Sequence, residues 1–216
     1  MAEGSRLIGL ARDLFWHVRA ERRIITPAMG EIRHAEPVKL FVGMLSAYPG
    51  ALAETEARLT QVLGAVDLRS DLWAHEFTEY YRDEMGQPLL RGFLSFAELI
   101  PPDRLAWVKR LTNQIEQDIA ASGEWPVLRP VNLDPGYIMP SRLVLATTKD
   151  NAHRIYLEGG IYGEVALLWR HNEWVPLEWT YPDYRTSDYH EFFTRVRGRL
   201  LENRPHGKRP AGKNAP

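Results

Sequence analysis

Side chains able to bind an anion or transfer a proton gather in one stretch of the chain, residues 129–164. Arginine, lysine and histidine can contact anions, whereas carboxylates can exchange protons or bind metal ions. The predicted ligand-binding residues of this stretch are Arg129, Asn132, Tyr137 and Lys149, and its predicted catalytic residues are Asp134, His153 and Glu164. With the acid Glu84 from an earlier polar segment, they predict a site for a small polar or anionic ligand.

A second polar group lies on a predicted helix. Its apolar residues recur at intervals of three and four and form one stripe: Leu105, Val108, Leu111, Ile115 and Ile119. Lys109, Thr112, Asn113 and Glu116 share a neighbouring stripe, because offsets of three, four and seven return to the same helical face. With the stretch above, they predict a polar pocket over the sheet. The alternative is a hydrogen-bond network that orders a proline-rich loop and needs no ligand.

An aromatic segment at residues 179–185 reads Trp-Thr-Tyr-Pro-Asp-Tyr-Arg. Aromatic rings beside a proline can stack on a base, or they can pin a loop by packing. We expect Tyr181 and Asp183 to contact the ligand. No metal ion is predicted, since His75-Glu76 begins like the zinc-protease motif HExxH but Glu79 stands where the second histidine belongs. The cofactor is left open.

Composition excludes several classes of function. Lys and Arg total 27 against 28 for Asp and Glu, a formal net charge of -1, so no overall field recruits nucleic acid or an acidic membrane. The absence of cysteine excludes disulfides and thiolate metal sites and is typical of a cytoplasmic protein. No apolar run approaches the roughly 20 residues that span a bilayer. Neither a GxSxG nucleophile elbow nor a GxxxxGK[ST] phosphate loop occurs.

The elements that position these residues predict an α+β fold. Strands are expected at residues 38–45, 66–77, 89–99 and 143–148, and helices at residues 52–63 and 105–119. This order is β-α-β-β-α-β, which predicts a ferredoxin-like split β-α-β core with residues 143–148 as its last strand. A C-terminal β-meander at residues 153–177 and a final helix that begins at Ser187 or Asp188 extend it.

Two local patterns place the candidate residues. Residues 132–137 are expected to form a tight turn, because Pro135 presets φ and Gly136 accepts a positive φ. Residues 153–157 and 161–169 are expected to form a hairpin with His153 opposite or diagonal to Glu164. That register puts the following side chains on one face: His153, Ile155, Leu157, Tyr162 and Glu164.

The chain is expected to have three parts. Residues 1–28 form a basic amphipathic helix or extension, residues 29–202 a single α+β domain, and residues 203–216 a disordered basic tail of prolines, glycines and cations. The first helix suits docking on a partner better than anchoring in a membrane. The oligomeric state of the protein is left open.

Several long strings occur in order along the chain: PVKLFVGML, FTEYYRDEMG, KRLTNQIE, RPVNLDPGYI, RLVLATTKDNAHRIYLEGGIYGEV and WTYPDYR. Over about residues 37–199 this order resembles a prokaryotic family, domain of unknown function 4416. The resemblance implies a soluble single-domain protein and brings no established activity. From the residues, the main hypothesis is binding, with turnover as an extension, of a small polar or anionic ligand such as a nucleotide. The alternatives are an RNA-binding module and an interaction protein that docks through its N-terminal helix.

Overall fold

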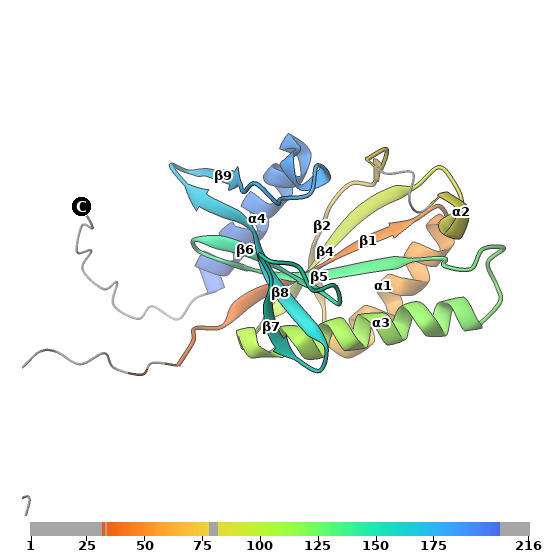
Figure 1. Ribbon diagram of the computed structural model, residues 1–216, viewed down its shortest axis with the longest axis horizontal. Coiled ribbons are helices and arrows are strands. Elements are labelled where there is room, and N and C mark those ends of the chain that lie inside the picture. Colours follow the sequence, from red (N-terminus) through yellow and green to blue (C-terminus); the bar gives the residue numbers. More distant parts are fainter. Residues whose placement is uncertain (1–31, 33, 78–81, 204–216) are drawn as a thin grey trace, which may run out of the picture. The chain divides into compact units, whose positions relative to one another are not determined.

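A computed structural model describes residues 32, 34–77 and 82–203, and their helices and strands belong to a unit that begins at Ala35. The predicted helix at residues 1–28 and nearly all of the predicted tail lie outside the described residues. The described chain has an α+β fold with one large antiparallel sheet, as the sequence predicts, together with three long helices (Figure 1).

The sheet has nine strands among the described residues, and seven of them follow the order β2-β4-β1-β5-β6-β8-β7. β3 pairs with β4, and β9 pairs with β8. The strands are β1 Val38–Ser46, β2 Val66–Arg69, β3 Trp73–Ala74, β4 Leu90–Ile100, β5 Asn132–Met139, β6 Arg142–Thr147, β7 Ile155–Glu158, β8 Ile161–Arg170 and β9 Glu173–Pro176. The helices are α1 Pro49–Leu63, α2 Arg82–Met85, η1 Pro102–Arg104, α3 Leu105–Ala121, η2 Asp183–Arg185 and α4 Ser187–Asn203.

Helices cover both faces of the sheet. On one face, α1 and α3 pack against Leu40 and Val42 of β1, and on the other, α4 packs against Phe41 (Figure 1). Residues 40–45 of β1 are therefore all apolar, because successive side chains enter different cores. On the α4 side, Phe93 stacks on Phe192 with ring centroids 5.6 Å apart.

The predicted turn at residues 132–137 is wrong, since these residues lie in β5, between β1 and β6. Pro135 has no N–H to donate, yet it fits a central strand. Its backbone points away from β1, as that of Leu133 does, and on that side β5 pairs with β6 only from Gly136 onwards, so no strand partner loses a donor. At Gly136 a side chain has no room, since an added Cβ would lie 2.5 Å from the carbonyl oxygen of Val144 and 2.6 Å from Cζ of Phe41. Glycine permits this close approach of β5 and β6.

Two further corrections concern pairing. Residues 143–148 do not pair with β1 as the last core strand, because β5 occupies that place and β6 pairs with β5 and β8. The predicted face of the hairpin is wrong in part, since Ile155 lies opposite Gly163 and Tyr156 opposite Tyr162. An irregularity between Tyr156 and Glu158 shifts the register, which the Gly159-Gly160 turn allows with φ of 55° and 77°.

β5 and β6 separate at one end. Their pairing stops at Gly136 and Leu145, and the next β6 residues, Ala146 and Thr147, pair with β8 alone. The first residues of β5 remain paired with β1. A gap therefore opens between two neighbouring strands on the side of α3.

Candidate functional site

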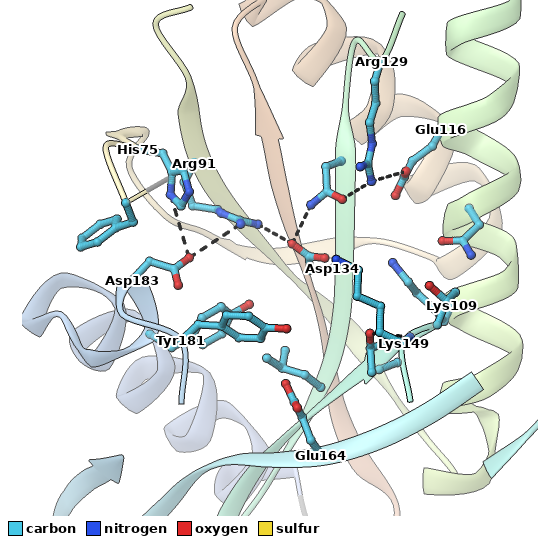
Figure 2. Close-up of a pocket in the computed structure, with 18 of the residues that line it drawn as sticks. His75, Arg91, Lys109, Glu116, Arg129, Asp134, Lys149, Glu164, Tyr181 and Asp183 are labelled. Carbon is cyan, nitrogen blue, oxygen red and sulfur yellow. Dashed lines mark hydrogen bonds and ion pairs between the residues drawn. The ribbon is translucent and has the colours of Figure 1, made fainter. Parts of the chain in front are cut away.

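A cavity of about 540 Å³ lies where β6 separates from β5. It is bounded by α3, by the diverging ends of β5 and β6, by β8, by the β3–β4 region and by the loop that leads into α4 (Figure 2). Its lining consists of His75, Phe77, Arg91, Lys109, Asn113, Glu116, Gln117, Arg129, Asn132, Asp134, Leu145, Ala146, Thr147, Thr148, Lys149, Glu164, Tyr181, Pro182, Asp183 and Tyr184.

Side chains of α3 replace the missing strand beside Leu133. Nζ of Lys109 donates to the carbonyl oxygen of Leu133 at 2.6 Å, and the backbone N–H of Leu133 donates to Oε1 of Glu116 at 2.8 Å. In a continuous sheet, β6 would supply both contacts. Burial raises the pKa of Glu116, although the cations Lys109 and Arg129 lower it in part.

Arg129 connects α3 with the start of β5. Its guanidinium donates to Oε2 of Glu116 at 3.0 Å and to Oδ1 of Asn132. Arg129 precedes β5, which begins at Asn132, and lies beside α3. Asn132 in turn donates to Oδ2 of Asp134 at 2.8 Å.

Arg91 of β4 is the buried cation that the sequence analysis missed. It is 4% exposed and donates to Oδ2 of Asp134 at 2.8 Å. Burial raises the pKa of Asp134, but the guanidinium of Arg91 and the cations Lys109 and Arg129 outweigh burial, so the pKa lies below its usual value. Asp134 therefore remains a carboxylate.

His75 and Asp183 adjoin Arg91. Oδ2 of Asp183 lies 3.7 Å from Nη2 of Arg91 and 3.9 Å from Nδ1 of His75. Burial, and then the charge of Arg91, lower the pKa of His75 to about 4, which keeps its ring neutral near pH 7. Burial raises the pKa of Asp183, partly offset by Arg91.

Glu164 of β8 forms the opposite wall. Its Oε2 lies 2.8 Å from Nε2 of His153 and 2.8 Å from Nε of Arg154. Arg154 also donates to the hydroxyl of Tyr181 at 2.8 Å and to the carbonyl oxygen of Lys149 at 2.9 Å. Arg154 thus fixes three separate segments around the cavity.

The predicted site residues that the structure brings to this cavity are Lys109, Asn113, Glu116, Arg129, Asn132, Asp134, Lys149, Glu164, Tyr181 and Asp183. Three others lie elsewhere. His153 contacts Glu164 from outside the cavity lining, and its ring stacks on that of Trp179 with centroids 5.2 Å apart. The indole N–H of Trp179 donates to the carbonyl oxygen of Val165. Tyr137 points to the core beside α3, and Glu84 is exposed on α2, where its carbonyl oxygen accepts the N–H of Arg129.

The lining residues missed from the sequence include His75, Phe77, Arg91 and Tyr184. Arg91 carried a signal, because it is the one charge in residues 90–97, the apolar part of β4, and a charge buried in a strand requires a partner. The other three follow no local periodicity. They reach the cavity through β3, its following loop and η2.

Within the described ranges, no group of three His, Cys, Asp or Glu side chains could hold a metal ion. In the same part of the chain, no helix is long and apolar enough to cross a membrane.

Fold and cavity together define the class of protein as an α+β domain with a charged pocket at a split in its sheet. The chain belongs to the family described as Domain of unknown function (DUF4416), whose model matches residues 36–199. This match confirms the resemblance carried by the sequence strings. The comparisons with curated proteins and with solved structures gave no match.

Proposed function

We propose that the pocket binds a small polar or anionic ligand, such as a nucleotide. The observation that carries the proposal is an open volume of about 540 Å³ lined by charged side chains that are themselves buried. Small-molecule sites occupy about 300–1,000 Å³ and combine apolar walls with a few convergent polar groups. Leu145, Ala146 and Tyr184 supply such walls here.

The open volume is the argument against a purely structural network. Lys109, Glu116 and Arg91 have internal partners, so part of the lining stabilises the fold. A network with only that role would close tightly, because protein interiors pack nearly as densely as organic crystals. The anion contacts would come from Lys109 of α3, from Arg129 in the segment before β5 and from Lys149 in the segment after β6.

Binding is better supported than turnover. A general base works best when its pKa lies near the working pH, whereas the cations around Asp134 hold its pKa low. The second predicted acid, Glu164, already accepts contacts from His153 and Arg154. These carboxylates therefore suit hydrogen-bond acceptance and the orientation of a ligand.

We also infer that β1 to β5 form a ferredoxin-like split β-α-β core. The partial strand order β2-β4-β1-β5, with α1 between β1 and β2 and α3 between β4 and β5, supports this interpretation. It would place the pocket beside the core strand β5, where the added strands diverge. A cytoplasmic location remains an expectation from the lack of cysteine.

The test is a thermal-shift and calorimetric screen of the whole chain against nucleoside mono- and triphosphates, sugar phosphates and divalent metal ions. A ligand at 100 times its Kd should stabilise the protein by about 2.7 kcal/mol. Lys149→Gln and Arg129→Gln should weaken binding of the anion found. Arg58→Gln, an exposed cation paired with Glu54 on α1, is the matched control and should leave affinity unchanged.

Two results would contradict the proposal. One is a screen in which no anionic compound stabilises the parent protein. The other is an anion that binds Lys149→Gln and Arg129→Gln as tightly as it binds the parent, since it would then occupy another site.

A further inference from the structure

The charges of the pocket are divided between its two sides. On one side stand three cations, Lys109, Arg129 and Lys149, with the carboxylate of Glu116, while the carboxylate of Glu164 lies on the wall formed by β8 and is paired with Arg154. On the other side His75, Arg91 and Asp183 stand together, and Asp134 lies between the two groups (Figure 2). The formal excess is positive beside α3. Beside η2, where Arg91 faces both Asp134 and Asp183, it is negative because His75 is neutral.

On the negative side, the carboxylate of Asp183 has no side-chain hydrogen-bond donor among the described residues. Asp183 is 5% exposed, yet its two nearest cationic or imidazole groups lie at 3.7 and 3.9 Å, beyond a normal hydrogen bond. Backbone amides of its own turn lower the pKa of the carboxyl through hydrogen bonds. Three neighbouring atoms in the same lining are buried without a partner: Nδ1 of His75, Nε of Arg91 and Oη of Tyr184.

Such atoms require an explanation, because buried polar groups in folded proteins nearly always have partners. His75 is 8% exposed and Tyr184 is 3% exposed, so bulk water does not satisfy their unpaired atoms. All of these residues line the same cavity as Asp183. The unpaired atoms themselves have almost no accessible surface, whereas a polar group bound beside Asp183 would supply the side-chain partner that its carboxylate lacks among the described residues.

Building on the proposed function, we propose that the ligand carries an N–H donor group opposite its anionic group and that Asp183 accepts the hydrogen bond. The chemical class is an amino-bearing organic phosphate, in which the amino group belongs to a nucleobase or to an aliphatic chain. A carboxylate accepts such a donor strongly because the bond is charge-assisted.

The experiment compares phosphates that differ in one group. Calorimetry on the whole chain would use cytidine against zebularine monophosphate, adenosine against purine riboside monophosphate, and phosphoethanolamine against 2-hydroxyethyl phosphate, so that the second member of each pair lacks the amino group and gains no N–H donor. The amino member of at least one pair should bind roughly tenfold more tightly, since a hydrogen bond to a charged group is worth about that factor. The nucleotide pairs and the aliphatic pair distinguish the two sources of the amino group.

Asp183→Asn should bring that ratio close to one, whereas Asp118→Asn, an exposed change on α3, should preserve it. An amino preference that persists in Asp183→Asn would overturn the assignment to Asp183. Equal affinities within every pair, with anions still bound, would overturn this inference and leave the proposed function standing. If none of the six compounds binds, and no anionic compound of the thermal-shift and calorimetric screen binds either, the proposed function itself is contradicted. The pairs measured on the parent protein test the inference even where Asp183→Asn fails to fold.

Discussion

Arg91→Met should be among the most destabilising changes in the pocket. The substitution keeps most of the apolar stem but removes the guanidinium that donates to Asp134 at 2.8 Å and lies 3.7 Å from Asp183. Loss of one partner from a buried ion pair costs about 3–5 kcal/mol, because the remaining charge stays desolvated. The side chain of Asp134 is 31% exposed and can recruit water, so we expect the lower end, about 3 kcal/mol near pH 7.

The loss should depend on pH with a definite sign. In the parent, burial already raises the pKa of Asp183 above its usual value, and loss of the Arg91 charge, which lowers that pKa, raises it further in the folded variant. The folded variant then binds more protons than the unfolded chain, so its free energy of unfolding decreases as pH rises through the folded pKa values. Between pH 7 and pH 5 the gap between parent and variant should therefore narrow.

Urea unfolding monitored by circular dichroism at pH 7 and pH 5 measures both effects. The matched control is Arg58→Met, whose side chain is 38% exposed and pairs with Glu54 one turn away, and it should cost about 0.5 kcal/mol or less. A loss below about 1 kcal/mol for Arg91→Met at pH 7, or a gap that widens at pH 5, would refute the reasoning from buried charge.

Two further predictions follow from the same pocket. Lys109→Met leaves the carbonyl oxygen of Leu133 without its buried donor and should lower the free energy of unfolding by about 1–3 kcal/mol in a urea titration. The control is Arg110→Met, at the next residue, which is exposed and should change the free energy of unfolding little. His75→Gln tests whether the pKa of His75 is about 4 in the folded protein, below its ordinary value of 6.5. Because folded His75 binds fewer protons than the unfolded chain in that window, its contribution to stability is complete above pH 6.5 and falls towards pH 4. Melting temperature measured against pH should therefore fall less steeply over pH 6.5 to 4 in His75→Gln than in the parent, and equal slopes would contradict the assigned pKa.

The sequence predicted best what depends on local periodicity. Lys109, Thr112, Asn113 and Glu116 were placed on one face because helical phase is set within a few residues. The structure puts Lys109, Asn113 and Glu116 in the cavity lining, whereas Thr112 is buried and donates to the carbonyl oxygen of Lys109. The contact between His153 and Glu164, 2.8 Å apart, was predicted from the hairpin, although an irregularity in β7 changed the face of Ile155. Hairpin proximity thus survives a local change in register.

The sequence failed where tertiary context overrides a local signal. Pro135-Gly136 is typical of a turn, but β5 tolerates Pro135 where β6 has separated, and it requires Gly136 where β6 approaches. The pairing of Arg91 with Asp134 spans 43 residues, so no local spacing could reveal it. Because the pocket results from the separation of β5 and β6, its position could not be derived before strand order was known.

The structural and ligand-binding roles of these residues do not exclude each other. A chain of contacts runs from Glu116 through Arg129, Asn132 and Asp134 to Arg91, so it joins the cationic side of the pocket to the Asp183 side. Opposite charges alternate along it, which offsets the cost of burial while each member keeps its neighbour. A ligand that contacts both ends would add partners without breaking the chain. Loss of stability in Arg91→Met and loss of affinity in Lys149→Gln are therefore expected together, as two consequences of one network built around an open cavity.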